Sequence, residues 1–356
     1  MKRNIYLKTI PPAEAVARVK ASIDREALIR EETIPSHEAS GRVLAHAVHA
    51  RYSSPTFHSA AMDGYAVNAR STFAAREGHP LTLKAGETCF AVNTGHPMPE
   101  GCDAVIMIEQ VVLDGGSVTI EAPAFPWQHV RRIGEDIVAT ELLFPRNHQL
   151  RPWDVGALLS GGIWDVPVWE RVTVRIIPTG DEVLDFTTHP DPGKGQVVES
   201  NSQMLAALAR ELGCVVERAA PVPDNPEALH QALKDSLDAG RHLTIFCAGS
   251  SAGSKDFTRA TLEKEGEILT HGIAAMPGKP SLLANCRGRL VAGAPGYPVS
   301  ALVCFKELLE PLISWLSHRE PPAKTVVPVE LTRTGSILPC VGPVQERPFT
   351  IDLRSR

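Results

Sequence analysis

The sequence lacks the features that mark a nucleic-acid-binding or a membrane protein. It has no block of lysine and arginine, and its formal net charge is only -5 over 356 residues, so its charge gives no reason to expect nucleic acid or an anionic membrane as a partner. The opening residues, MKRNIYLKTIPPAEA, turn polar before a signal-peptide core could form, and no later stretch stays apolar long enough to cross a bilayer. We therefore expect a cytoplasmic protein.

The cysteines also lack a pattern. No CxxC pair indicates a zinc site or a redox couple, and the number of cysteines, seven, is odd. We expect buried or incidental thiols at these widely scattered positions: Cys89, Cys102, Cys214, Cys247, Cys286, Cys304 and Cys340.

What is present is an ordinary globular composition, 43% hydrophobic and 22% charged, in a chain long enough for two or three domains. Residues 12–23 carry apolar side chains at helical spacing, and residues 151–167 have the pattern of a short helix ended by Gly-Gly. Residues 51–138 instead form short β-like runs broken by glycine and proline. We expect residues 1–50 and 139–170 to form one discontinuous helical domain, interrupted by a β-rich domain at 51–138.

Residues 171–320 alternate strand-like and helix-like patterns, from VTVRIIP to VSALVCFKELLEPLISWL. Such alternation implies right-handed crossovers and a parallel sheet covered by helices on both faces. The expected fold class is therefore multidomain α/β, with a three-layer α/β/α domain over these residues. A short β-like tail follows at 321–356.

Four glycine-rich turns stand out in this α/β region: 176–182, 247–256, 275–280 and 292–301. Three of them directly follow predicted strands, at the sheet edge where open parallel sheets bind ligands. Glycine lets backbone N–H groups approach a ligand, and helix N-termini add partial positive charge, although glycine also serves simply to connect a strand to a helix. The turns predict an anion-binding pocket, with further donors from Ser250, Ser251, Ser254 and Lys279.

Carboxylates gather in the same turns. Beside a phosphate site they can hold Mg²⁺, which proteins usually bind through one or two carboxylates together with phosphate oxygens and water. Helix capping is the alternative role, and for Asp256, which precedes FTRATLEKEG, both roles stay open. The residues concerned are Asp181, Glu182, Glu199 and Asp256.

Eight motifs follow one another along nearly the whole chain. In order, they are SAAMDGYAV (59–67), VNTGHPMPEGCDAVIMIE (92–109), RRIGEDI (131–137), PTGDEV (178–183), GQVVESN (195–201), SSAGSKD (250–256), MPGKP (276–280) and PGYPVSA (295–301). With them the chain resembles the MoeA-type molybdopterin molybdenumtransferases, whose eukaryotic relatives include gephyrin. Segments such as SSPTFHSAAMDG and AGSSAGSKDFT are most similar to a subfamily often fused to a periplasmic-binding-like module.

The resemblance implies a reaction in which adenylylated molybdopterin and molybdate give molybdenum cofactor and AMP, with Mg²⁺ assisting loss of the nucleotide. Both substrates are anionic and need N–H, hydroxyl and cationic donors. The two sulfurs that take the metal belong to the pterin, so no protein cysteine is required. The resemblance further implies a molybdopterin-binding domain of the MoaB/Mog type at 171–320 and, at 321–356, the truncated start of a C-terminal β domain.

Residue roles follow from the matched motifs. Asp256, Asp63 and Asp136 are the implied catalytic residues. The last two come from the β-rich domain of the other protomer, so the resemblance implies a homodimer with its site at the subunit interface. The implied Mg²⁺ ligands are Asp181, Glu182, Glu199 and Asp256. The implied substrate-binding residues are His58, Thr179, Gly180, Ser250, Ser251, Gly253, Ser254, Lys279, Pro295, Gly296 and Ser300.

Three departures from the family pattern keep other functions open. His58, Ser59 and Ala60 stand where most members have an acidic residue, Asn and Ser; GSSAGS replaces GGVSVG; and the chain stops where the last domain should be under way. One alternative is a non-catalytic scaffold or carrier that binds the pterin without turnover. Another is a different nucleotide-handling enzyme on the same α/β domain, such as a nicotinamide-nucleotide amidase, because a fold alone does not fix a function.

Overall fold

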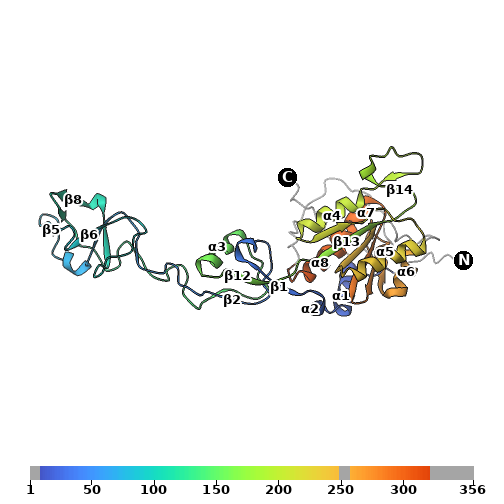
Figure 1. The fold of residues 1–356 in the computed structure, drawn as a ribbon, viewed down its shortest axis with the longest axis horizontal. Coiled ribbons are helices and arrows are strands. Elements are labelled where there is room, and N and C mark those ends of the chain that lie inside the picture. Colours follow the sequence, from blue (N-terminus) through green and yellow to red (C-terminus); the bar gives the residue numbers. More distant parts are fainter. Residues whose placement is uncertain (1–8, 248–256, 321–356) are drawn as a thin grey trace, which may run out of the picture. The chain divides into compact units, whose positions relative to one another are not determined.

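The computed structural model describes residues 9–247 and 257–320, and the chain divides into two compact units (Figure 1). One unit is formed by residues 33–168, and the other combines residues 1–32 with residues 169–356. Within the described residues, no helix has the length and apolar character that a membrane span needs.

A six-stranded sheet forms the centre of the second unit, in the order β16-β13-β17-β20-β19-β18. The first four strands in this order are parallel, as expected, but β19 is antiparallel to both β18 and β20. A two-residue turn of Arg287 (φ 52°) and Gly288 (φ 78°) joins β19 to β20, and so short a link can connect only antiparallel neighbours. The strands are β13 (Thr173–Pro178), β16 (Val215–Arg218), β17 (Leu243–Cys247), β18 (Gly266–His271), β19 (Leu282–Cys286) and β20 (Arg289–Ala294).

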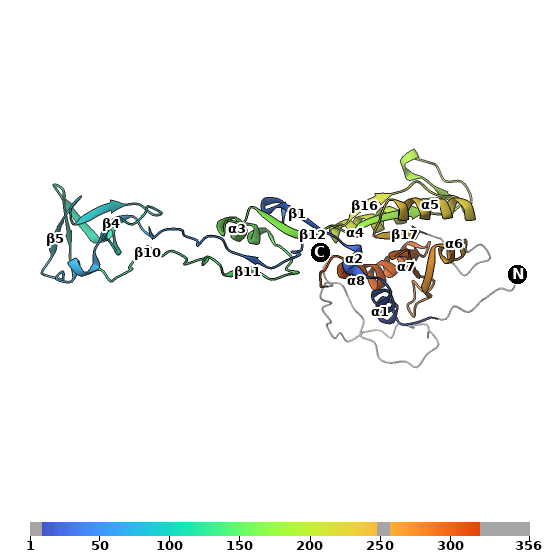
Figure 2. The same cartoon turned by 60° about the horizontal axis from the view of Figure 1, so that its bottom comes forward.

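Helices cover both faces of this sheet, which confirms the three-layer prediction (Figures 1 and 2). On one face, leucines of α5 (Pro226–Asp238) share a core with Ile177 of β13 and Phe246 of β17, and α6 (Phe257–Glu265) packs beside α5. On the other face, α4 (Asn201–Glu211) packs on β13 and contacts α7. The chain continues from α7 (Pro298–Cys304) through a π-helical turn, η5 (Phe305–Leu309), into α8 (Glu310–Leu316).

The helix predicted near the start of the chain is α1 (Pro12–Ser22), and a single turn, α2 (Arg25–Leu28), follows it. The sequence pattern placed this helix in a domain with residues 139–170, but α1 contacts β18, β19 and η5 of the α/β unit. Ala15 and Val19 are buried on its inner face. Helical spacing shows that a helix has an apolar face but not which partner covers it.

The unit formed by residues 33–168 has separate cores. Residues of the segment 39–48 pack with residues of 150–168, among them Leu158 of α3 (Pro152–Ser160), the short helix predicted before Gly-Gly. Between these segments in sequence, two three-stranded antiparallel sheets enclose apolar clusters. Their orders are β6-β4-β7 and β5-β9-β8. The division into four domains stays a prediction, and residues 321–356 lie outside the described part of the chain.

The strands of this unit are short, and those outside residues 51–138 lie in segments that the sequence pattern assigned to a helical domain. They are β1 (Glu31–Pro35), β2 (Val48–His49), β3 (Ser59–Ala60), β4 (Gly64–Val67), β5 (Leu81–Lys84), β6 (Cys89–Val92), β7 (Ala104–Met107), β8 (Val111–Asp114), β9 (Ser117–Ile120), β10 (Val130–Arg131), β11 (Leu142–Phe144) and β12 (Asp165–Trp169).

Replacing Gly64 by alanine tests how closely these strands pack. A Cβ atom at Gly64 would lie 2.0 Å from the backbone oxygen of Ile106 on the neighbouring strand, so Gly64→Ala should lower the free energy of unfolding by about 3 kcal/mol. Chemical denaturation followed by circular dichroism measures the change. Gly156→Ala is the control, because its Cβ would enter open space on a helix and should stabilise by about 1 kcal/mol at most. Equal effects of both variants would contradict the packing argument.

An ion-pair network on the α/β unit gives a pH-dependent stability. Glu265 is bonded to His230 (2.6 Å) and to Arg287, which also pairs with Asp238 at 3.0 Å. The hydrogen bond from His230 is the main cause that lowers the pKa of Glu265 below its ordinary 4.5, and Arg287 adds to it. A carboxylate whose pKa is lower in the folded than in the unfolded protein stabilises the fold. This contribution is complete at a pH above the unfolded-state pKa and is lost as the pH falls through the folded-state pKa.

We therefore expect Glu265→Gln to destabilise the protein at neutral pH, with a difference from wild type that shrinks as the pH falls below about 4.5. Urea unfolding of both proteins across this range measures it. Glu267→Gln, at an exposed position of β18, is the control and should show no such trend. A constant difference at every pH would exclude Glu265 as the source.

Candidate functional site

A cavity of about 710 Å³ lies where β13, β17 and β20 end. Because β13 pairs with β16 on one side and with β17 on the other, the chain leaves β13 at the point where the strand order reverses, and such points form crevices in open α/β sheets. The cavity is lined by Pro178, Thr179, Glu182, Val183, Val197, Val198, Glu199, Ser200, Asn201, Cys247, Met276, Pro277, Gly278, Lys279, Pro280, Pro295, Gly296, Tyr297, Pro298 and Ser300.

The turn after β13 is fixed by hydrogen bonds. Both the backbone N–H and the hydroxyl of Thr179 donate to the carbonyl of Cys247, each at 2.9 Å, and so join the ends of β13 and β17. Gly180 follows with φ +137°, where a Cβ would come within 2.8 Å of the Val183 side chain. Gly180 does not itself line the cavity. Its role is to let the backbone adopt the conformation of the turn.

Two further turns complete the wall. The side-chain amide of Asn201 donates to the carbonyl of Gly296 at 2.7 Å and ties the start of α4 to the loop after β20. In the other turn, Gly278 has φ +110° and its carbonyl accepts a bond from the Ser281 hydroxyl at 2.7 Å. Lys279 follows on the surface and lines the cavity. The walls thus combine polar groups with apolar side chains.

The three carboxylates in this region differ in their surroundings. Glu182 is exposed and lines the cavity. Asp181 lies outside the lining and accepts a hydrogen bond from the backbone N–H of Asp224 at 3.0 Å. Glu199 is buried and is bonded to Ser202 and Arg218. Within the described residues, no three His, Cys, Asp or Glu side chains gather to hold a metal ion.

Cys247 is the cysteine at the cavity wall. Burial is the main cause that raises the pKa of its thiol, and the neighbouring Glu199 carboxylate raises it further. The thiol therefore stays protonated at neutral pH and is a poor nucleophile or metal ligand. This agrees with the expectation of a buried thiol.

The three candidates in the 33–168 unit are held by local contacts. Asp63 accepts bonds from the backbone N–H (2.7 Å) and the hydroxyl of Thr94, and the backbone bond is the main cause that lowers its pKa. Asp136 pairs with Arg131. The ring of His58 contacts that of Trp127 in a tilted arrangement, with ring centroids 4.8 Å apart and an interplanar angle of 51°. Its Nδ1 accepts a bond from the backbone N–H of Ile133.

The cavity joins seven predicted residues from separate segments of the chain: Thr179, Glu182, Glu199, Lys279, Pro295, Gly296 and Ser300. Asn201 lies in the GQVVESN motif but was not predicted as a site residue, because only the carboxylate of that motif suggested a ligand-binding role. Sequence reasoning also missed Met276 and Tyr297, which are 76% and 81% exposed, and apolar side chains give no sign of their exposure in a single sequence. Five predicted residues lie outside the described part of the chain: Ser250, Ser251, Gly253, Ser254 and Asp256.

Comparison with known proteins adds independent evidence. The model of the MoeA N-terminal region (domain I and II) matches residues 10–162, and the model of a probable molybdopterin binding domain matches residues 175–315. The molybdopterin molybdenumtransferase of Haemophilus influenzae is 34% identical over 309 residues, which cover 81% of this chain and 74% of that protein. That of Synechococcus elongatus is 32% identical over 301 residues, covering 79% and 74%.

A solved structure agrees in fold. The molybdopterin biosynthesis MoeA protein of Pyrococcus horikosii aligns with a TM-score of 0.75 and 29% identity, covering 88% of this chain and 81% of that one. The family models and the curated relatives both extend across the two units described above. The chain therefore belongs to the MoeA family of molybdopterin molybdenumtransferases.

Proposed function

We propose that this protein inserts molybdate into adenylylated molybdopterin and releases AMP, as a step of molybdenum cofactor biosynthesis. The observation that carries the proposal is the cavity at the switch point of the sheet, in a domain that matches molybdopterin-binding domains. Relatives named as transferases favour turnover over the carrier and amidase alternatives.

The cavity residues suit such a ligand. Lys279 and Ser300 offer a cation and a hydroxyl for an oxyanion or phosphoryl group, whereas Val183, Val197 and Val198 offer apolar surface for a planar ring. In this proposal the sulfurs that receive molybdenum belong to the substrate, and the buried Cys247 thiol, with its raised pKa, takes no part. The protein's part is to hold the two anions together and to stabilise charge on the departing nucleotide.

Magnesium is part of the proposal. Glu182 is the carboxylate that fits best, since it is exposed at the cavity wall, and one carboxylate with substrate phosphate oxygens and water is a usual Mg²⁺ environment. When bound, Mg²⁺ would neutralise negative charge on the phosphoryl oxygens. Asp181 and Asp256 stay proposed ligands, whereas the bonds of Glu199 to Arg218 and Ser202 favour a structural role.

The direct test is AMP release from adenylylated molybdopterin by the purified chain, with and without molybdate and Mg²⁺. We expect release to require both. Lys279→Met should lower the rate about 100-fold, because it removes a charge-stabilising donor. Lys234→Met, at an exposed position on α5, is the control and should leave the rate unchanged. Tight binding of the pterin without AMP release would instead make the protein a carrier.

We also propose a homodimer in which Asp63 and Asp136 of one chain serve the cavity of its partner. Two exposed aromatic side chains support self-association: Trp153 of α3 is 67% exposed, and Trp164, which follows the helix in sequence, is 56% exposed. Exposed aromatic side chains of this kind are enriched at protein interfaces.

Paired variants test whether the site is shared. Asp63→Asn and Lys279→Met chains, co-expressed with different tags and purified through both, should form heterodimers with about half of the wild-type activity. In a two-fold dimer, one of the two shared sites then carries neither change. Each variant alone serves as the control and is expected to lose most of its activity, about 100-fold for Lys279→Met. Heterodimers that stay inactive would show that each site is built from a single chain. A cytoplasmic location and the fused subfamily stay predictions from the sequence.

A further inference from the structure

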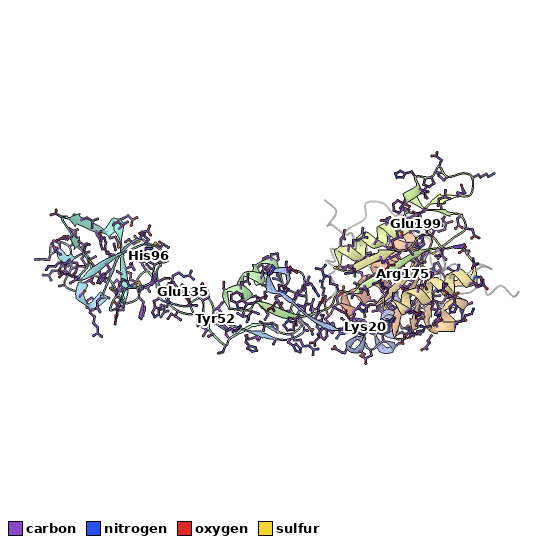
Figure 3. All side chains as sticks on the ribbon, viewed as in Figure 1. Lys20, Tyr52, His96, Glu135, Arg175 and Glu199 are labelled. Carbon is purple, nitrogen blue, oxygen red and sulfur yellow. The ribbon has the colours of Figure 1, made fainter. Side chains whose placement is uncertain are left out.

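The strands β14 (Val183–Leu184) and β15 (Val197–Val198) pair in parallel at the two ends of a surface loop. The loop leaves the domain after β14 and returns before α4, and Glu199, labelled in Figure 3, lies at its base. Val183, Val197 and Val198 line the cavity. One wall of the candidate site is therefore formed by a two-stranded ribbon outside the main sheet, and a pairing of two residues per strand is weak by itself.

A single side chain holds both ends of this loop. Arg218, the last residue of β16, donates from Nη2 to the carboxylate of Asp185, where the loop leaves, at 3.1 Å. The same nitrogen lies 3.4 Å from the carboxylate of Glu199, where the loop returns. Its Nε donates to the Ser202 hydroxyl at 2.9 Å, and its guanidinium carbon lies 4.6 Å from the ring centroid of Phe186. The planar guanidinium fork suits such divided contacts, which a lysine ammonium does not reproduce.

The acceptors of Arg218 are themselves fixed. Asp185 caps the turn η4 (Phe186–Thr188) by accepting from the backbone N–H of Thr187 at 3.0 Å. That bond is the main cause that lowers the pKa of Asp185, and Arg218 adds to it. Glu199 accepts from the backbone N–H of Ser202 at 2.7 Å, within the first turn of α4. The side chains are well shielded from water, with exposures of 13% for Arg218, 22% for Asp185 and 4% for Glu199.

We propose that Arg218 is a positioning residue, which clamps Asp185 to Glu199 and thereby holds Val183, Val197 and Val198 as one wall of the ligand cavity. Among the described residues, Arg218 is not part of the cavity lining, so it acts through the loop and not on the ligand. It also neutralises Glu199, which explains why that carboxylate serves the fold instead of a metal ion. A buried carboxylate left without its cation would be strongly unfavourable.

The proposed effect of Arg218 on substrate binding rests on the proposed function, whereas its effect on the loop does not. Its structural effect can be measured without any substrate, by trypsin cleavage at the exposed Lys194–Gly195 bond inside the loop. We expect Arg218→Met to raise the rate of this cleavage about tenfold, because opening of the loop no longer breaks two ion pairs. Arg218→Lys keeps the positive charge but lacks the planar guanidinium group. Its cleavage rate should lie between those of wild type and Arg218→Met.

Arg287→Met is the matched control, since Arg287 also bridges two carboxylates, Asp238 and Glu265, and neither lies at the cavity. Both variants should have a lower melting temperature than wild type. Only Arg218→Met should increase the rate of cleavage at Lys194. In the AMP-release assay, only Arg218→Met should raise KM, about tenfold, with kcat changed less than threefold. The circular dichroism spectrum of Arg218→Lys should match that of wild type, which shows that its increased cleavage does not come from misfolding. The proposal fails if cleavage at Lys194 is the same in Arg218→Met, Arg287→Met and wild type. Increased cleavage with no AMP release by wild type would retain the clamp and overturn the proposed reaction.

Discussion

The side-by-side pairing of β13 and β17 is the constraint on which the candidate site depends. From β13 the chain passes through α4 to β16 on one side of the strand, and from β16 through α5 to β17 on the other. The helices must therefore diverge to opposite faces of the sheet, and the ends of the two strands stay uncovered. Thr179 fixes this opening, because its backbone and its side chain both bind the carbonyl at the end of β17.

Two carboxylates near the cavity, Glu199 and Glu182, differ in their surroundings and therefore in the roles they can take. Glu199 and Glu182 both come from motifs that suggest metal ligands, yet they meet different surroundings. Glu199 is buried against a guanidinium, a hydroxyl and a backbone N–H, which together satisfy its acceptor capacity. Glu182 lies at the surface and lines the cavity, so it is the carboxylate that the proposed function assigns to a ligand. In the proposed function, anion binding therefore rests on Lys279 and the hydroxyl donors of the cavity, because Arg218 is bonded to Asp185 and Glu199.

The sequence alone determined the main features of the fold. Alternating apolar runs identified β13, β17, β20 and the helices between them, since a buried parallel strand needs an uninterrupted apolar run. Glycine-rich turns at the strand ends identified most of the cavity, because such ends meet at one edge of the sheet. Eight motifs identified the family, which the comparisons confirm.

Tertiary structure decided the rest. The short strand β16 has no long apolar run to predict it, so the position of Arg218 at its end, between Asp185 and Glu199, could not be inferred from spacing. Strand β19 is antiparallel to β20 because a two-residue turn joins them. Helix α1 packs on β18 and β19 although it lies far from them in sequence. Local patterns record which residues prefer a helix, a strand or burial. Which charges meet, and which face covers which, depends on contacts between residues distant in the chain.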